Sequence, residues 1–425
     1  MTSKRLTAVV LAASLAAAGC GGSAGDDDNT FRIWHYESPD SAMAVAWNKA
    51  VDQLKQRHPD LNVVVEEKGF EQIRKTASMV LGSNEAPDVL EYNKGNASTG
   101  LLAKQGLLVD LTDEVKAKGW DAKVGAVDTA ARYDESGVMG GDKWYGVPNY
   151  AEYVLVYYNK DMFDQQGLRP PTTLDELTAA MDEFTAAGIT PLATGGGEYP
   201  AHQVLYQLAL TEADRDWVDR YQRYTGDVDF HDKAWTKGAT TFADWVAKGY
   251  VNKDDAGLKA EDMGLSFMQG KQPIMITGSW WFGRVKATIK DFQWGTTAWP
   301  GPMTSGGSGN LWVVPKGSEK QDIAKEFIDI TLSQEIQDVL RDSGGVALAA
   351  GDGQAADPQT QRLNEDFAAV AAADGFAFYP DWPAPGFYDV HVSAVQKLMT
   401  GGATPDQALD ELVGPYRENL ADIGK

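Results

Sequence analysis

Residues 142–163 read DKWYGVPNYAEYVLVYYNKDMF and change character at Pro148. Downstream of this proline, residues 153–158 (YVLVYY) place apolar side chains on both faces of the segment. This pattern indicates a strand that is buried on two sides within an α/β sheet. Because proline fixes its own φ and pushes Val147 towards extended geometry, the chain enters the strand along a restricted path. The stretch therefore predicts a crossover between two lobes, with a cleft beside it.

The chain begins with a secretory signal. Lys4 and Arg5 precede an apolar run, residues 6–18, that is too short to span a bilayer. Small residues then lead to Cys20, the only cysteine, and together they resemble a bacterial lipobox. We therefore expect residues 1–19 to be a signal peptide and Cys20 to carry a lipid that anchors the protein to the outer face of the cell membrane. A plain signal peptide cut nearby is the alternative, because Ala17 stands where a larger aliphatic residue is usual.

Residues 20–30 are polar, glycine-rich and acidic, so they predict a flexible tether. The remaining chain is longer than one hydrophobic core usually grows, which favours two lobes. The net charge of the full sequence, −23, repels phosphate backbones and anionic lipid, so nucleic acid and the membrane surface are disfavoured as partners. A lone cysteine also excludes intramolecular disulfides.

Strand and helix signals alternate in the first third of the chain. Residues 31–36, 61–66 and 86–92 have strand character, and the stretches between them have helical periodicity. Such β-α-β repeats predict an α/β fold in which each lobe is a mainly parallel sheet flanked by helices. We take residues 294–302 as the return crossover, which gives a first lobe of residues 31–147 plus 303–345. The second lobe is then residues 148–302 plus 346–425, with the C-terminal helices packed on it.

Several segments, in order along the chain, resemble the bacterial extracellular solute-binding proteins, family 1, the sugar-capturing subunits of ABC importers. They are APDV (86–89), LLVDL (107–111), WYGVP (144–148), YYNKDMF (157–163), KQPIMITGSWW (271–281) and LWVVPKGS (311–318). The resemblance implies a periplasmic-binding-protein-like fold with a ligand cleft between its lobes, no catalysis and no cofactor. It also implies a carbohydrate ligand, a membrane permease as partner and a monomer. Residues 91–96 and 382–387 further resemble lipoproteins that bind xylobiose or cellobiose.

Aromatic residues are abundant, with thirteen tryptophans and sixteen tyrosines. A sugar ring has an apolar face and a rim of hydroxyls, so proteins hold it with aromatic platforms and short polar side chains. Trp280 and Trp281 follow Gly278-Ser279 at the end of a predicted strand, where one of them is expected to stack on the ligand and the other to be buried.

The polar candidates lie at strand ends and at the crossover. Asn93, Lys94 and Asn96 follow the third strand, where an ordinary turn is the alternative, and Asn149, Tyr150 and Glu152 follow Pro148. Asn310 and Trp382 are candidates by family position. Glu37 and Glu198 are weaker candidates, since each is also compatible with a solvated position.

The sequence offers little evidence for an enzyme. It contains no phosphate-binding loop, no H-E-x-x-H and no paired C-x-x-C, and its five histidines show no metal-ligand spacing. We therefore expect neither a metal nor a cofactor. A secreted glycoside hydrolase stays open, because the carboxylates are too numerous to choose a catalytic pair. A binding protein for a cationic small molecule, held in an aromatic cage, is the third interpretation.

Overall fold

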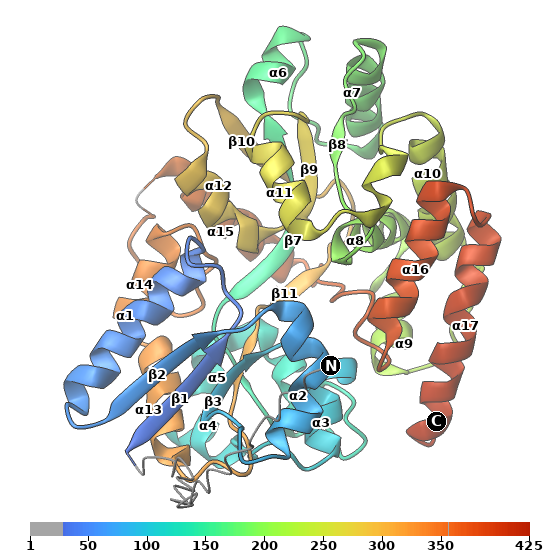
Figure 1. The fold of residues 1–425 in the computed structure, drawn as a ribbon. Coiled ribbons are helices and arrows are strands. Elements are labelled where there is room, and N and C mark those ends of the chain that lie inside the picture. Colours follow the sequence, from blue (N-terminus) through green and yellow to red (C-terminus); the bar gives the residue numbers. More distant parts are fainter. Residues whose placement is uncertain (1–28, 356) are drawn as a thin grey trace, which may run out of the picture.

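The computed structural model describes residues 29–355 and 357–425. The predicted signal peptide, Cys20 and most of the predicted tether lie outside these residues. The described chain forms two α/β halves, and strand β7 (Ala151–Asn159) runs from one towards the other (Figure 1). We refer to them as the first and second lobes.

The first lobe is built on a five-stranded sheet of order β2-β1-β3-β12-β6. Its strands are β1 (Thr30–His35), β2 (Asn62–Glu67), β3 (Val89–Tyr92), β6 (Val147–Pro148) and β12 (Leu311–Val313). β1 pairs in parallel with both β2 and β3, as the β-α-β repeats predict. β12 enters between β3 and β6 and is antiparallel to both, because it returns from the second lobe.

The second lobe is built on a sheet of order β10-β7-β9-β8, and β11 also pairs with β7. These strands are β8 (Leu192–Ala193), β9 (Ile274–Gly278), β10 (Trp294–Ala298) and β11 (Gly306–Ser308). β7 is antiparallel to β9, β10 and β11, and only β8 and β9 are parallel neighbours. Both sheets are therefore mixed. In the first sheet β12 alone runs against the other strands, as a mainly parallel sheet predicts, whereas the second sheet is mainly antiparallel. The direction of β7 is set by its entry from the other lobe, which an apolar pattern does not encode.

Helices flank both sheets (Figure 1). Those of the first lobe are α1 (Ala42–Arg57), α2 (Phe70–Leu81), α3 (Leu101–Lys104), α4 (Thr112–Lys118), α5 (Trp120–Val124), α13 (Gln321–Thr331) and α14 (Gln334–Asp342). Those of the second lobe are α6 (Lys160–Gln165), α7 (Leu174–Ala186), α8 (Tyr199–Ala209), α9 (Arg215–Arg223), α10 (Lys233–Ala247), α11 (Ala260–Met268), α12 (Phe282–Thr288), α15 (Pro358–Ala372), α16 (Phe387–Thr400) and α17 (Pro405–Asp422).

Short elements complete the chain. They are the π-helical turn η1 (Asn96–Gly100), the 3₁₀ turns η2 (Gly125–Ala131), η3 (Leu210–Glu212), η4 (Lys253–Gly257) and η5 (Ser279–Trp281), and a two-stranded ribbon of β4 (Arg132–Tyr133) and β5 (Lys143–Trp144). The C-terminal helices pack on second-lobe helices, since α16 contacts α8 and α10, and α17 contacts α10. No helix within the described residues is long and apolar enough to cross a membrane.

Strand β7 is buried on both faces, which confirms the prediction from its apolar pattern. Val154 and Val156 belong to the core beneath α7, α8 and α10, whereas Leu155 and Tyr157 point to the opposite core beneath α11 and α12. Burying apolar surface at about 25 cal/mol per Å² makes such a strand a major source of stability. It is a fixed element beside which a cleft can be held.

The chain passes between the two sheets three times. It first crosses between β6 and β7, at residues 149–150, and returns between β11 and β12, at residues 309–310. These two segments are hydrogen-bonded, since Gly309 N donates to Tyr150 O at 2.9 Å and Asn149 N donates to Asn310 O at 3.2 Å. The return lies beyond the predicted residues 294–302, because β11 still pairs with β7. The third passage leads from α14 to Val346, which bridges to Ala151.

Candidate functional site: a cleft between the lobes

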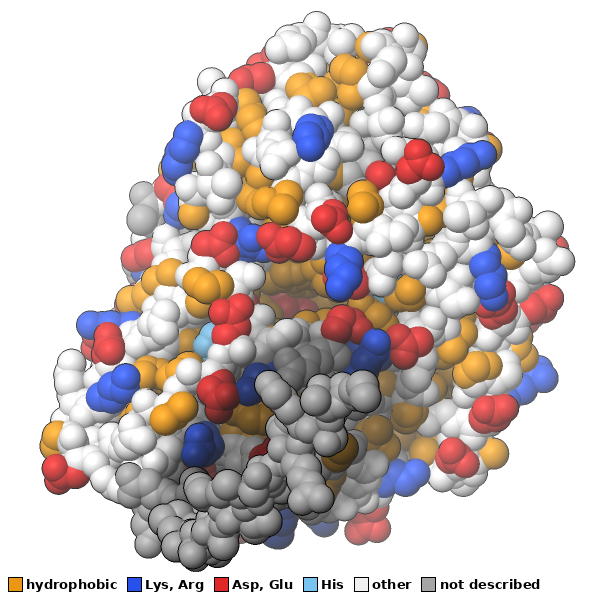
Figure 2. All heavy atoms as spheres, in the orientation of Figure 1, with side chains coloured by type: hydrophobic (Ala, Val, Ile, Leu, Met, Phe, Trp, Pro, Cys, Tyr) orange, Lys and Arg blue, Asp and Glu red, His pale blue; other side chains and the backbone are white. Residues whose placement is uncertain are grey.

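A cavity of about 480 Å³ lies between the lobes. Side chains of the first lobe, the second lobe and the crossing segments all line it, including Tyr36, Glu37, Phe70, Glu71, Asn93, Lys94, Tyr150, Glu152, Glu198, Tyr199, Gln203, Trp280, Trp281, Asn310, Tyr379, Asp381, Trp382 and Tyr388. Figure 2 shows the hollow between the halves, with acidic and basic side chains around its mouth and apolar ones inside. Its size is that of an ordinary small-ligand site.

Trp280 and Trp281 form one aromatic wall. Both indole N–H groups donate to the Tyr199 hydroxyl, at 3.2 Å and 3.1 Å respectively. Trp281 is buried and Trp280 is half-buried, in line with the expectation that the two adjacent rings differ. The Trp280 ring folds back over Gly278, where an added Cβ would lie 1.7 Å from it. A glycine before the tryptophan pair is therefore required for this ring position.

A second aromatic wall comes from the loop before α16. The Tyr379 ring centroid lies 6.1 Å from that of Trp280 and 5.3 Å from that of Trp382. Trp382 packs against Gly95, whose φ is 94° and where a Cβ would meet the indole at 2.5 Å. The backbone oxygen of Trp382 also accepts from Ala97 N at 2.8 Å. Gly95 thus permits the close approach that holds this wall against the first lobe.

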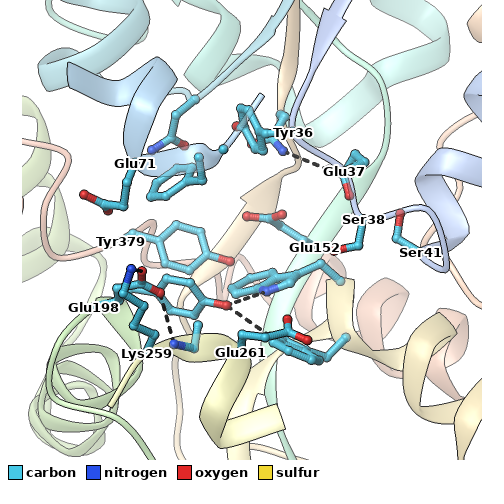
Figure 3. A pocket seen from close by; sticks show the side chains of 18 of the residues that line it. Tyr36, Glu37, Ser38, Ser41, Glu71, Glu152, Glu198, Lys259, Glu261 and Tyr379 are labelled. Carbon is cyan, nitrogen blue, oxygen red and sulfur yellow. Dashed lines mark hydrogen bonds and ion pairs between the residues drawn. The ribbon is translucent and has the colours of Figure 1, made fainter. Parts of the chain in front are cut away.

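The floor of the cleft is a buried polar network. Lys94 Nζ lies 2.6 Å from Glu152 Oε1, and both side chains are only 4% exposed. Lys94 also donates to Asn310 Oδ1 at 3.2 Å, and Tyr150 OH donates to Glu152 Oε2 at 2.8 Å. Lys94 follows β3 of the first lobe, whereas Glu152 begins β7 of the second, so the ion pair joins the lobes at the crossing. Figure 3 shows Glu37 and Glu152 facing into the cavity from this side.

Three carboxyl groups share this floor with a single cation. Burial, and then the neighbouring Glu152 carboxylate, raise the pKa of Glu37 to about 7. Burial, and then the Glu37 carboxylate, raise the pKa of Glu91 well above its usual value. Glu37 Oε1 accepts from Asn310 Nδ2 at 3.3 Å, and Glu91 Oε1 accepts from Asn149 Nδ2 at 2.7 Å. Near neutral pH the network therefore holds at least one bound proton.

Ion pairs connect the two lobes beside the cleft. Arg284 of α12 contacts Glu261 at 2.8 Å and, across the lobes, Asp40 at 2.9 Å. Arg74 of α2 reaches Asp389 of α16 at 2.8 Å. The Arg284–Asp40 and Arg74–Asp389 contacts join first-lobe and second-lobe elements.

Ten of the twelve predicted ligand residues line the cavity. They are Glu37, Asn93, Lys94, Tyr150, Glu152, Glu198, Trp280, Trp281, Asn310 and Trp382. Asn96 and Asn149 do not reach it. The Asn96 amide is occupied by Met139 N and Gln222 O, both at 2.8 Å, and Asn149 is fully buried behind the floor. Both asparagines therefore have structural partners in place of a ligand.

Other lining residues were not singled out from the sequence. The chief ones are Tyr36, Gln203, Tyr379, Asp381 and Tyr388. Tyr36 precedes Glu37 at the end of β1, so the rule that loops at strand ends carry ligand groups could have found it. Gln203 lies within a helix, and Tyr379 and Asp381 lie in an irregular loop, where no periodic signal indicates which side chain faces inward. No group of three potential metal ligands occurs among the described residues.

Two α/β lobes around one cleft, with several chain crossings, define a two-lobed ligand-binding protein. A solved structure from a study of xylan utilisation by Caldanaerobius polysaccharolyticus has the same fold. Its TM-score is 0.78 at 21% identity, and the match covers 90% of this chain and 98% of the other. A chitin oligosaccharide binding protein gives a TM-score of 0.76, also at 21% identity, covering 93% and 99% of the two chains.

The family model described as "Bacterial extracellular solute-binding protein" matches residues 40–338, and the chain belongs to this family. It is therefore an extracellular binding component of an ABC transporter and not a glycoside hydrolase. The diacetylchitobiose binding protein DasA of Streptomyces coelicolor is 27% identical over 466 residues, 99% of each chain. A multiple sugar-binding protein of Streptococcus mutans is 28% identical over 169 residues, 39% of this chain and 40% of its own.

Proposed function

We propose that this protein captures a di- or oligosaccharide in the cleft and delivers it to a membrane permease. The observation that carries the proposal is the joining of two aromatic walls and a polar floor in one cavity of about 480 Å³. Aromatic faces match the apolar C–H faces of sugar rings, and amide, hydroxyl and carboxylate groups match their hydroxyls. The sugar names of DasA and of the Streptococcus mutans relative support the same ligand class.

A β-linked plant disaccharide, xylobiose or cellobiose, is the first ligand to test. The sequence of residues 91–96 and 382–387 supports it, and the two segments contact each other at Gly95 and Trp382. The structural neighbour from xylan utilisation supports it as well. N,N′-diacetylchitobiose belongs in the same panel because of the ligand that DasA is named for.

Isothermal titration calorimetry with this panel, alongside maltose and raffinose, tests the proposal. The Trp280→Ala variant should lose about 2–4 kcal/mol of binding free energy, the range for a buried aromatic anchor. Phe292→Ala is the matched control, since Phe292 is a partly buried aromatic residue of the second lobe outside the cavity. Full affinity in Trp280→Ala would refute the proposal that Trp280 stacks on the sugar. If no saccharide binds, the proposal that the ligand is a saccharide is wrong.

We also propose that Cys20 is the lipidated amino-terminus of a monomeric protein on the outer face of the membrane. The small residues before the single cysteine and the acidic stretch that follows support this placement. The acidic stretch would keep the binding domain in solvent while the lipid holds it near the permease.

A further inference from the structure

The lining of the cleft has more acidic than basic side chains. Seven carboxylate residues line it, Glu37, Glu67, Glu71, Glu152, Glu198, Glu261 and Asp381, against four cationic residues, Lys68, Lys94, Lys259 and Arg284. Figure 3 shows acidic residues of both lobes, Glu37 and Glu261 among them, around the same space. A ligand in this cavity therefore meets a net negative field.

Each cation of the lining already has a carboxylate partner. The nitrogen-to-oxygen distances are 2.6 Å for Lys68 with Glu66 and for Lys94 with Glu152, 2.8 Å for Arg284 with Glu261 and 3.8 Å for Lys259 with Glu198. Arg284 has a second partner in Asp40. A ligand carboxylate would have to displace one of these protein carboxylates to gain a counter-charge. The displaced carboxylate would then lose the cation that neutralises it.

Asp381 is the opposite case, a carboxylate of the lining without a cation. Its side chain is 12% exposed, and the one basic group of the described residues within 4 Å is His202 Nε2, at 3.9 Å from Oδ1. Burial lowers the pKa of His202 well below its usual value, so this ring is neutral. Burial raises the pKa of Asp381 to about 6, which leaves it ionised in most molecules at pH 7. The backbone N–H of Asp381 donates to its own carboxylate, and Lys94 and Arg74 attract this carboxylate from farther away. The lone pairs that remain can accept from a ligand O–H or N–H.

Gln203 provides a second unfilled acceptor in the cavity. Its Oε1 atom is buried and has no hydrogen-bond partner among the described residues. Gln203 is adjacent in sequence to His202 on α8, and the cavity is lined by both Gln203 and Asp381. An unpaired buried acceptor is unfavourable, and a ligand O–H or N–H would satisfy it.

We infer that the cleft selects saccharides by charge, with Asp381 as a specificity-determining residue. Neutral and amino saccharides bind, and saccharides that carry a uronic carboxylate are rejected. A hydroxyl or ammonium group can donate to the carboxylate of Asp381, whereas a ligand carboxylate adds a like charge where each cation that the described residues bring to the lining is already paired. This inference rests on the proposed sugar-binding function and adds the ligand's charge class to it.

The test is a ligand series that varies charge on one backbone. Cellobiose, cellobiouronic acid and chitobiose are titrated into the protein at pH 7 by calorimetry; if cellobiose does not bind, the series is built on the neutral saccharide that binds best. We expect the uronic acid to bind at least about tenfold more weakly than the neutral sugar, and the amino sugar at least as tightly as the neutral one.

Asp381→Asn keeps the size of the side chain and removes its charge. We expect this variant to reduce the neutral-to-uronic affinity ratio to within about threefold. Asp374→Asn is the matched control, because Asp374 lies in the same segment with a 78% exposed side chain outside the cavity. It should keep the wild-type ratio. A melting curve for each variant reports folding, and the wild-type series stands as a test even if a variant does not fold.

The outcomes separate this inference from the proposed function. Equal or tighter binding of the uronic acid by the wild type overturns charge selection and leaves sugar binding in place. An unchanged ratio in Asp381→Asn overturns the role of Asp381. Failure of every saccharide, whatever its charge, overturns both the inference and the proposed function.

Discussion

Replacing Lys94 by methionine removes the one cation that the described residues place in the floor of the cleft. The change leaves the carboxyl groups of Glu37, Glu91 and Glu152 together without a counter-charge, while methionine preserves most of the volume of the lysine stem. Because Lys94 and Glu152 are each only 4% exposed at 2.6 Å, the loss is that of a broken buried pair, about 3–5 kcal/mol. We therefore expect the free energy of unfolding at pH 8 to fall by this amount.

Two further variants isolate the cause. Lys68→Met is the matched control, since Lys68 also lies 2.6 Å from its partner Glu66 but the two side chains are 20% and 35% exposed. This control should lower the free energy of unfolding by less than about 1 kcal/mol, because solvent-exposed ion pairs contribute little to stability. The double variant Lys94→Met/Glu152→Gln removes both charges, so it should recover most of the stability that Lys94→Met loses.

Urea unfolding followed by tryptophan fluorescence measures these differences. The penalty of Lys94→Met should shrink at pH 5, because Glu37, with a pKa of about 7, is then protonated and the repulsion is reduced. Equal losses of unfolding free energy in Lys94→Met and Lys68→Met would refute the idea that burial makes the Lys94–Glu152 pair contribute more to stability than an exposed pair. A penalty independent of pH would refute the charge-balance argument.

Four other predictions concern protonation, structure, motion and location. The folded-state pKa of Glu37, about 7, lies above its unfolded value, so the native protein binds an extra proton and loses stability as pH rises from about 5 to 7. The Glu37→Gln variant should abolish this loss. In urea unfolding it should raise the free energy of unfolding at pH 8 by roughly 2–3 kcal/mol. Asn96→Ala should cost about 1–3 kcal/mol in unfolding experiments by stranding Met139 N and Gln222 O, yet leave sugar affinity within about twofold by calorimetry. The lobes should close on the ligand, so the small-angle scattering radius of gyration should fall on saturation, and an unchanged radius in a sample with confirmed binding would count against closure. Cys20→Ser should release protein into the medium, and a variant that still fractionates with membranes would disprove lipidation.

The sequence predicted the lobes' general architecture because apolar periodicity reports burial directly. The run at residues 153–158 indicated a strand covered on both faces, and β7 has this burial. Strand direction was not predictable in the same way. Whether β7 is parallel or antiparallel to β9 depends on which end of the sheet the crossing segment reaches, and side-chain pattern carries no such information.

Site residues at strand ends were predictable, and those in helices and loops were not. Glu37 and Lys94 follow β1 and β3, where the carboxyl ends of neighbouring strands meet. Asn96 lies two residues after Lys94 and also has a polar side chain, but its amide donates to Gln222 O instead of facing the cavity. Asp381 was missed because its environment depends on His202 and Lys94, which are far away in the sequence.

The Tyr199 hydroxyl favours one orientation of a bound saccharide over the other. A phenol oxygen has two lone pairs, and here both are taken by the indole N–H groups of Trp280 and Trp281, so only its proton remains to offer a ligand. Asp381 has only lone pairs to offer. A linear saccharide has two different ends. Its ring and bridging oxygens accept hydrogen bonds, and its hydroxyl groups donate them. The Tyr199 hydroxyl requires an acceptor and Asp381 requires a donor, so the two orientations of the same saccharide in the cleft differ in energy.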